Sequence, residues 1–264
     1  DSYCSNVGNN TNSGLSGSAP MEDLNALLAK YDLESGDTVY IDTGLYRDVD
    51  PWRITQADSA GNLGLPPVVF QGSTNALYST VVDRAGGSTG IQVDYAIGVL
   101  LRNITISNTV GQAVTFNDCF DAGAEWITIG VGNIGFQLSG GEQLRVAHSL
   151  VYDTAQGVML RNWNQNTNMV YPLLEHNVFW ELFDTALTIE GQHQATIRHN
   201  IFSVAPNHYV FSLGSLGRLI SDYNSFWLAN GGRVYRQGQS LAVSPVPIIY
   251  ATVGAWAAAS SNDL

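Results

Sequence analysis

The sequence predicts an all-β solenoid, a parallel β-helix, over residues 37–240. Three observations support this fold class. From Asp37 onward, short β-branched and aromatic runs each end at Gly, Asn or Asp, the pattern of short strands. The runs recur with gaps of 23, 23, 28, 23 and 24 residues. No helical period interrupts them, and strand-only repeats with a period in the twenties stack as the coils of a solenoid.

The segment before the repeats has a different pattern. Residues 1–20 are punctuated by Asn, Gly and Pro at almost every step and are predicted as loop. Residues 21–31 are predicted as one short helix, because Leu24, Leu27 and Leu28 fall at helical spacing. This helix is expected to cover the N-terminal end of the solenoid.

One position marks each coil. It is occupied in turn by Asn103, Trp126, Ser149, Asn177, Asn200 and Asn224. Asn tolerates the left-handed backbone of a sharp turn, and stacked amides can hydrogen-bond from coil to coil. We therefore predict a structural ladder of Asn103, Asn177, Asn200 and Asn224. Ligand binding, or glycosylation at Asn9 and Asn103, is the alternative.

Histidines recur one residue before these marks. His148, His176 and His199 occupy the same place in three successive coils, and Tyr223 occupies it in the fourth. The rings are predicted to stack beside the Asn turn. A metal site or a proton-transfer array is the alternative. No carboxylate recurs beside all three histidines, so no metal site is assigned.

The Asn-x-Phe turns at Asn177, Asn200 and Asn224 resemble those of the pectin-lyase-like superfamily of right-handed parallel β-helices. Residues 36–46 resemble the first-coil motif of its secreted and cell-surface members, and residues 8–14 resemble their lead-in. The resemblance implies a lead-in and cap over residues 1–36. It also implies a C-terminal strand and short helix, packed on the barrel, over residues 241–264. It does not select a function, because the superfamily includes enzymes, adhesins and structural modules.

Charge and composition exclude some partners. The chain has 11 Lys and Arg against 23 Asp and Glu, a net charge of −12, which argues against nucleic acid. The uncharged residues 237–262 contain Pro245 and Pro247, so no membrane span is predicted. No signal peptide follows Asp1. An acidic, lysine-poor chain rich in Asn, Gly, Ser and Thr is expected to be extracellular or at the cell surface.

The two cysteines, Cys4 and Cys119, are too few for a disulfide scaffold or a zinc site. In an oxidising compartment we expect one bridge between them, which would close a loop of about 115 residues. Two buried thiols are the alternative.

Polar residues recur on the second strand of each coil and are predicted to form a flat face made of Thr115, Asn117, Gln137, Ser139, Met159, Arg161, Thr188, Glu190 and Ser212. Candidate sugar contacts are Asn117, Gln137, Ser139, Arg161 and Glu190. Arg161 is expected to bind an acid group, and Glu190 or His193 to transfer a proton. An ordinary surface ion pair between Arg161 and Glu190 is the alternative. No catalytic residue is assigned more firmly.

Other candidate sites are weaker. The acidic segment from Asp118 to Glu125 could hold calcium, although its spacing is not that of an EF-hand. Apart from this possible calcium, no cofactor is predicted. Aromatic residues could stack on sugars or pack at coil edges, namely Trp163, Trp180, Tyr209 and Trp227.

Two functions follow from these observations. The first is a non-catalytic β-helix module that builds a fibre, sheath or adhesin or binds a glycan, with polysaccharide or further copies of itself as partners. The second is a polysaccharide lyase or C5-epimerase acting on an acidic glycan. The catalytic signatures expected by resemblance to such enzymes are missing, which favours the first.

Overall fold

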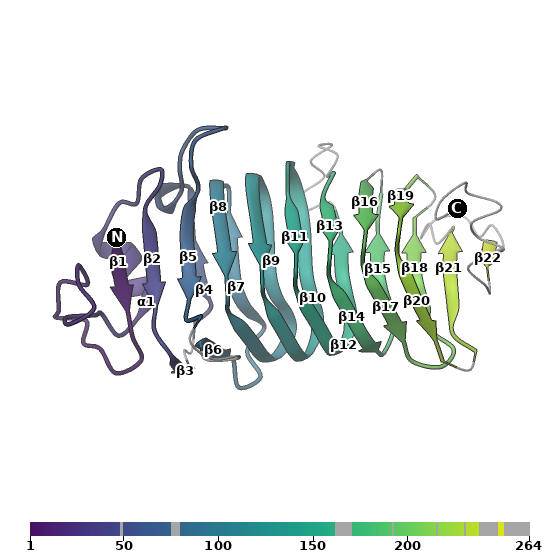
Figure 1. Cartoon of the computed structure of the whole chain (residues 1–264), viewed down its shortest axis with the longest axis horizontal. Coiled ribbons are helices and arrows are strands. Elements are labelled where there is room, and N and C mark those ends of the chain that lie inside the picture. Colours follow the sequence, from purple (N-terminus) through teal and green to yellow (C-terminus); the bar gives the residue numbers. More distant parts are fainter. Residues whose placement is uncertain are drawn as a thin grey trace.

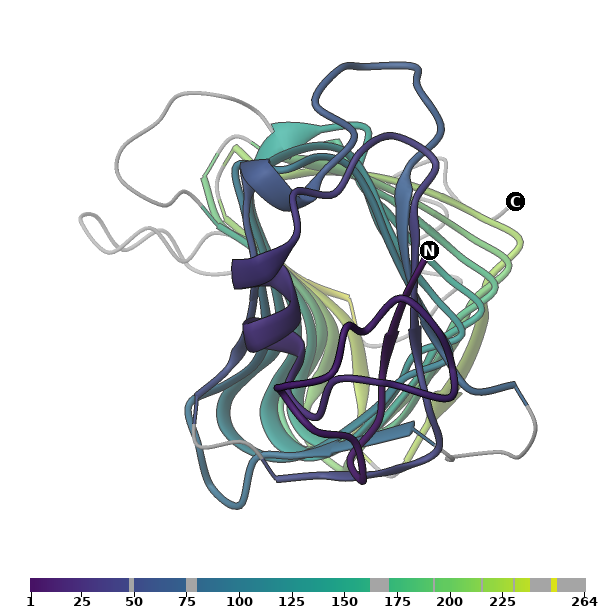
Figure 2. The same ribbon diagram turned by 90° about the vertical axis from the view of Figure 1, so that its left-hand side faces the viewer.

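The computed structural model describes residues 1–47, 50–74, 80–161, 171–191, 193–214, 216–229, 231–237 and 248–250. Its strands wind into one elongated parallel β-helix, with the N-terminus near one end (Figure 1). Seen from the N-terminal end, successive coils lie behind one another and form three sides, here named A, B and C (Figure 2). The predicted all-β parallel β-helix is confirmed.

Each side is a stack of parallel strands. Side A contains β1 (Ser2–Cys4), β2 (Thr38–Ile41), β5 (Val68–Gly72), β8 (Ile97–Arg102), the end of β9 (Thr105–Glu125), β11 (Arg145–Ala147), β13 (Leu173–Glu175), β16 (Gln194–Arg198) and β19 (Arg218–Asp222). Side B contains β3 (Gly44–Tyr46), β6 (Thr80–Asp83), the starts of β9, β10 (Thr128–Glu142) and β12 (Leu150–Leu160), β14 (Val178–Leu182), β17 (Ile201–Val204) and β20 (Ser225–Leu228).

Side C contains β4 (Trp52–Ile54), β7 (Thr89–Asp94), the middle of β9, the later parts of β10 and β12, β15 (Thr185–Ile189), β18 (Tyr209–Leu213) and β21 (Arg233–Gln237). β22 (Ile248–Tyr250) pairs with β21 in the antiparallel sense. A short 3-10 helix spans Gln56–Asp58. The predicted C-terminal helix beyond Tyr250 lies outside the described residues, and so does the insertion that contains Trp163.

Alternate residues of each strand point into the coil and fill its centre. Phe179 and Phe202 occupy equivalent inward positions, and their rings stack with centroids 5.2 Å apart. Both are fully buried. Burial of a side chain of this size stabilises the fold by about 1.5–3 kcal/mol. The outward residues, which alternate with the inward ones along each strand, are therefore the ones available for binding.

The N-terminal end of the β-helix is covered by its own chain. Helix α1 spans Leu24–Lys30, shorter than the predicted residues 21–31, because the Asp23 side chain accepts a hydrogen bond from the Asn25 N–H and caps the helix there. Asn25 also accepts a hydrogen bond from the Arg53 N–H and donates one to the Pro51 carbonyl. The Asn25 side chain thus supplies hydrogen-bond partners to backbone groups at the open edge of β4. Residues 2–4, predicted as loop, form β1 instead.

The asparagine ladder is present, but two of the six predicted coil marks, Asn103 and Trp126, lie one position earlier in their coils. Asn177 Nδ2 donates to Asn200 Oδ1 at 3.1 Å, and Asn200 Nδ2 donates to Asn224 Oδ1 at 3.0 Å. Asn103 does not belong to this ladder. It pairs in register with Trp126, one position earlier in the coil, and has a left-handed φ of 53°.

That left-handed position belongs to the aromatic rings. Trp126, His148, His176, His199 and Tyr223 all have φ between 52° and 57°. Their rings stack in sequence, with centroids 4.6, 5.1, 4.9 and 5.3 Å apart. The predicted stacking of the histidines is confirmed, and each histidine ring has a neighbouring ring on both of its faces.

The predicted disulfide is wrong in this structure, where Cys4 and Cys119 are both buried and form no disulfide with each other. Cys4 lies on β1 and Cys119 on β9, with β2, β5 and β8 stacked between those strands. Four strand spacings of ~4.8 Å separate the two coils by roughly 19 Å. A disulfide needs Cα atoms within about 7 Å.

Candidate functional site

The outward polar residues of side C form two columns that follow the solenoid axis, which we name the polar strip. The first column is Gln92, Thr115, Gln137, Met159, Thr188 and Ser212. The second is Asp94, Asn117, Ser139, Arg161 and Glu190. The structure therefore stacks every residue of the predicted polar face in one region.

The outward face that the sequence predicts is present, but much of it is buried. Thr115 is 5% exposed, Gln137 2% and Ser139 0%, and Met159 and Ser212 are also buried. Arg161 is half-buried and Glu190 is exposed. The strip thus has a buried polar floor beside one more accessible ion pair.

Hydrogen bonds within the strip satisfy only part of this floor. Asn117 Nδ2 donates to Asp94 Oδ1 at 2.8 Å, and Gln137 Nε2 donates to Ser139 Oγ at 3.2 Å. Among the residues that the structure describes, Thr115 Oγ1, Asn117 Oδ1 and Gln137 Oε1 have no hydrogen-bond partner. Buried polar atoms are nearly always satisfied by protein, water or ligand. These three atoms, on two adjacent coils, therefore have unused hydrogen-bonding capacity.

The predicted meeting of Arg161 and Glu190 is found. Arg161 Nε lies 3.6 Å from Glu190 Oε2, too far for a good hydrogen bond but within ion-pair range. Because both side chains are 40% or more exposed, the pair contributes at most about 1 kcal/mol to stability. The guanidinium therefore retains donors for a ligand.

His193 is placed differently from the other candidates. It is 1% exposed, and burial lowers the pKa of its imidazole below the ordinary value. A neutral imidazole is able to accept a proton, but His193 has almost no surface for a substrate to reach. The exposed part of the site consists of Arg161 and Glu190.

The possible calcium loop is not a loop. Residues 118–125 belong to strand β9, and the carboxylate of Glu125 pairs with Arg102 and Arg145. Across the part of the chain that the structure describes, no group of three or more His, Cys, Asp or Glu is placed to hold a metal ion.

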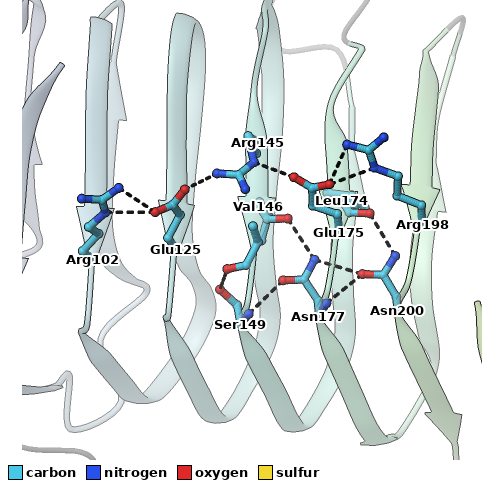
Figure 3. A network of polar contacts seen from close by, with 11 residues as sticks. Arg102, Glu125, Arg145, Val146, Ser149, Leu174, Glu175, Asn177, Arg198 and Asn200 are labelled. Carbon is cyan, nitrogen blue, oxygen red and sulfur yellow. Dashed lines mark hydrogen bonds and ion pairs between the residues drawn. The ribbon is translucent and has the colours of Figure 1, made fainter. Parts of the chain in front are cut away.

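Sequence reasoning missed a charge ladder on side A. Arg102, Glu125, Arg145, Glu175 and Arg198 alternate in sign along the axis (Figure 3). Three of the ion-pair distances are 2.8 Å. Burial alone would raise the pKa of the Glu175 carboxyl, but hydrogen bonds from Arg145 and Arg198 outweigh it and hold that pKa below its ordinary value.

A periodic signal for this ladder exists in the sequence. Four members directly precede the left-handed position of their coil, namely Arg102, Glu125, Glu175 and Arg198. The steps from Arg102 to Glu125 and from Glu175 to Arg198 are both 23 residues. Opposite charges one period apart predict a coil-to-coil ion pair once the register is known.

No protein-family model matches the sequence, and no curated protein matches it either. Among solved structures, an alginate lyase from Paenibacillus sp. str. FPU-7 has a TM-score of 0.52 at 12% identity, over 81% of this chain and 95% of that one. The chain has the pectin-lyase-like β-helix fold. Pectate lyase Pel9A matches with a TM-score of 0.40 at 13% identity, over 92% and 81% of the two chains. A GH136 lacto-N-biosidase from Eubacterium ramulus also gives 0.40, at 9% identity over 86% and 68%.

On this pectin-lyase-like scaffold the polar strip offers two kinds of chemistry. Its unsatisfied carbonyl oxygens, Asn117 Oδ1 and Gln137 Oε1, accept hydrogen bonds and therefore need a donor, which a hydroxyl supplies and a carboxylate does not. Arg161 supplies the complementary cation. No helix in the described residues is long and apolar enough to cross a membrane.

Proposed function

We propose that the polar strip of side C binds an acidic polysaccharide. The observation that carries this proposal is the group of buried, unsatisfied oxygens at Thr115, Asn117 and Gln137. Sugar hydroxyls both donate and accept, so a glycan chain along the axis can satisfy these atoms once the side chains of Thr115, Asn117 and Gln137 turn outward to meet it. A uronate carboxylate then meets the Arg161 guanidinium, a charge-assisted contact that is stronger than a neutral one.

Several further points support a glycan as the partner class. One similar solved structure, with a TM-score of 0.52, is named an alginate lyase, which makes alginate the first polysaccharide to test. Copies of the chain are the other predicted partner class. The N-terminal end, where a copy would stack, is covered by α1 and the lead-in. We propose that the chain acts outside the cell, because it is acidic, poor in lysine and rich in Asn, Gly, Ser and Thr.

Affinity electrophoresis of the whole chain in gels containing alginate or polygalacturonate tests the proposal. The experiment belongs at about 0.15 M salt, where the Debye length of about 8 Å screens the net charge of −12. We expect retardation of the wild-type chain. We expect Arg161→Ala to weaken binding about tenfold, a loss of about 1.4 kcal/mol.

Arg218→Ala is the matched control, because it removes an equally charged, exposed arginine from side A. Gln137→Leu tests the buried floor, since it removes the unsatisfied oxygen and keeps an apolar stem of similar size. Equal affinity of Arg161→Ala, Gln137→Leu and the control would refute binding at the strip.

A second candidate function is eliminative cleavage or C5-epimerisation of a uronate. The adjacency of Arg161 and Glu190 favours it, because the cation stabilises the uronate carboxylate while the Glu190 carboxylate takes the C5 proton. In cleavage a C4–C5 double bond forms, the C4–O bond breaks, and the departing oxygen takes a proton from water. Unsaturated ends or altered uronate composition after incubation would identify this activity, and Glu190→Gln should abolish it.

A further inference from the structure

Side B carries a second outward surface with a different chemistry. Over four coils its two outward columns contain Leu150, Val178, Ile201 and Ser225, and Tyr152, Trp180, Ser203 and Trp227. None of these eight residues is charged, in a chain with a net charge of −12. Trp227 is 67% exposed, and Trp180 and Ile201 are exposed as well. An exposed apolar patch of this kind marks an interaction site.

The aromatic members of this surface are Tyr152, Trp180 and Trp227, which we name the aromatic ridge. The Tyr152 ring lies against Gly130 of the preceding coil, where any Cβ would collide with it. Trp180 and Trp227 come from strands two spacings apart, roughly 9.6 Å. Their ring centroids are only 6.4 Å apart, so the indoles lean toward each other. Ser203 on the intervening strand β17 pairs in register with Trp227 and is buried.

The chemistry of the ridge favours a neutral partner. Aromatic faces are electron-rich and attract the C–H groups on the face of a pyranose ring. The ridge has no cation to pair with a uronate carboxylate, unlike side C with its Arg161, so a neutral glycan suits it better than a polyuronate. A second copy of this acidic chain would bring like charge. Exposed His176 and His199, from the ring stack beside the same strands, offer ring edges to sugar hydroxyls.

The geometry also favours one chain over a crystalline surface. The Trp180 and Trp227 planes are inclined by 44°, so a flat ligand cannot lie on both. A single glycan chain can twist from one ring to the next. We propose that the aromatic ridge of side B binds a single chain of a neutral polysaccharide, independently of the polar strip on side C.

Affinity electrophoresis in gels that contain hydroxyethyl cellulose, xyloglucan or glucomannan tests this proposal. We expect at least one of these neutral glycans to retard the wild-type chain. Trp227→Ala should weaken that retardation at least tenfold, and Trp180→Ala should weaken it too. Since Trp227 is largely exposed, its replacement leaves the core intact, and unchanged circular dichroism verifies this.

Two controls separate the alternatives. Tyr95→Ala removes an exposed aromatic side chain from the turn between β7 and β8 and should change nothing. Arg161→Ala should keep neutral-glycan binding, so binding at the aromatic ridge and binding at the polar strip are tested independently. No retardation by any of the three glycans, or retardation that survives both Trp substitutions, overturns the proposal. Sedimentation showing a dimer that Trp227→Ala dissociates overturns it too, because the occupant is then a second copy.

Discussion

A single amide in the asparagine ladder connects three coils. Asn200 Oδ1 accepts hydrogen bonds from the backbone N–H and the side chain of Asn177. Its Nδ2 donates to the Leu174 carbonyl and to Asn224 Oδ1. Both Asn177 and Asn200 are 1% exposed, so no solvent can replace these bonds. The side chain thus satisfies buried backbone groups at the corner between sides A and B.

Replacing Asn200 by Ala should lower the free energy of unfolding by about 2–4 kcal/mol. The substitution leaves the Asn177 N–H and the Leu174 carbonyl buried without partners, at about 1–3 kcal/mol for each such group. Chemical denaturation measures the change. Asn103→Gly is the control, because Gly accepts the left-handed backbone that Asn103 adopts outside the ladder. If Asn103→Gly lowered the free energy of unfolding as much as Asn200→Ala does, the register described here would be contradicted.

Acid should weaken the charge ladder in a defined direction. The folded-state pKa of Glu175 is lowered from 4.5, so its stabilisation is present above pH 4.5 and is lost as the pH falls through the lower folded-state value. Glu175→Gln should cost about 2 kcal/mol near pH 7, since hydrogen bonds to charged groups contribute about 1.5–3 kcal/mol.

Thermal unfolding of the wild type and Glu175→Gln, compared from pH about 7 to about 3, measures this effect. The difference in stability between the two should shrink as the pH falls. A difference that stays constant over this range would show that the Glu175 carboxylate does not contribute through its charge.

The two thiols should be present but unreactive in the folded chain. Burial raises the pKa of the Cys119 thiol to about 12, so almost no thiolate forms at neutral pH. Thiol titration without reductant should detect no rapid reaction in the native protein and two thiols per chain after denaturation. Finding no thiol in the denatured, unreduced chain would mean that a disulfide forms after all.

At the scale of the elements, strand positions follow from the sequence better than register does. The 23-residue period and strand-only runs predict the β-helix because each coil must satisfy its backbone against its neighbours. The assignment of Asn103 fails because two adjacent turn positions both accept Asn, one for its left-handed backbone and one for its amide. A one-residue ambiguity of this kind leaves the fold unchanged and alters which side chains stack.

The candidate site, like the fold, was predictable only in part. Its columns are predictable, because the register that stacks the core also stacks Asn117 on Ser139 and brings Arg161 to Glu190. The burial of Gln137 is not predictable, since it depends on how neighbouring side chains lie over the strands. The charge ladder was missed because Arg145 belongs to a different column from the other members and interrupts the pattern.

Helix α1 is a seven-residue element that depends on packing for its stability. Leu27 is fully buried beneath it, so Leu27→Ala should lower the stability of the N-terminal end of the β-helix by about 2–5 kcal/mol. Hydrogen exchange should then show lost protection in β1, β2 and β4, which the lead-in and α1 cover, and unchanged protection in β15 and β16. Equal loss along the whole solenoid would contradict a local capping role.

At the scale of the whole molecule, stacking coils turns each outward position into a column that follows the long axis. Side A presents alternating charge, side B an uncharged aromatic ridge, and side C a polar strip with a buried floor. Columns of this kind suit linear polymers, because a repeating ligand meets a similar group at each coil. The direction of these columns therefore agrees with the proposed binding of a polysaccharide along the long axis of the β-helix.

The most direct test of the central proposal, binding at the polar strip, is a crystal structure of the chain with a bound oligouronate. We predict that the oligosaccharide lies along side C, with hydroxyls within hydrogen-bond distance of Thr115 Oγ1 and Gln137 Oε1 and a carboxylate at Arg161. An oligosaccharide bound elsewhere on the molecule, with only ordered water over Thr115, Asn117 and Gln137, would contradict the proposal.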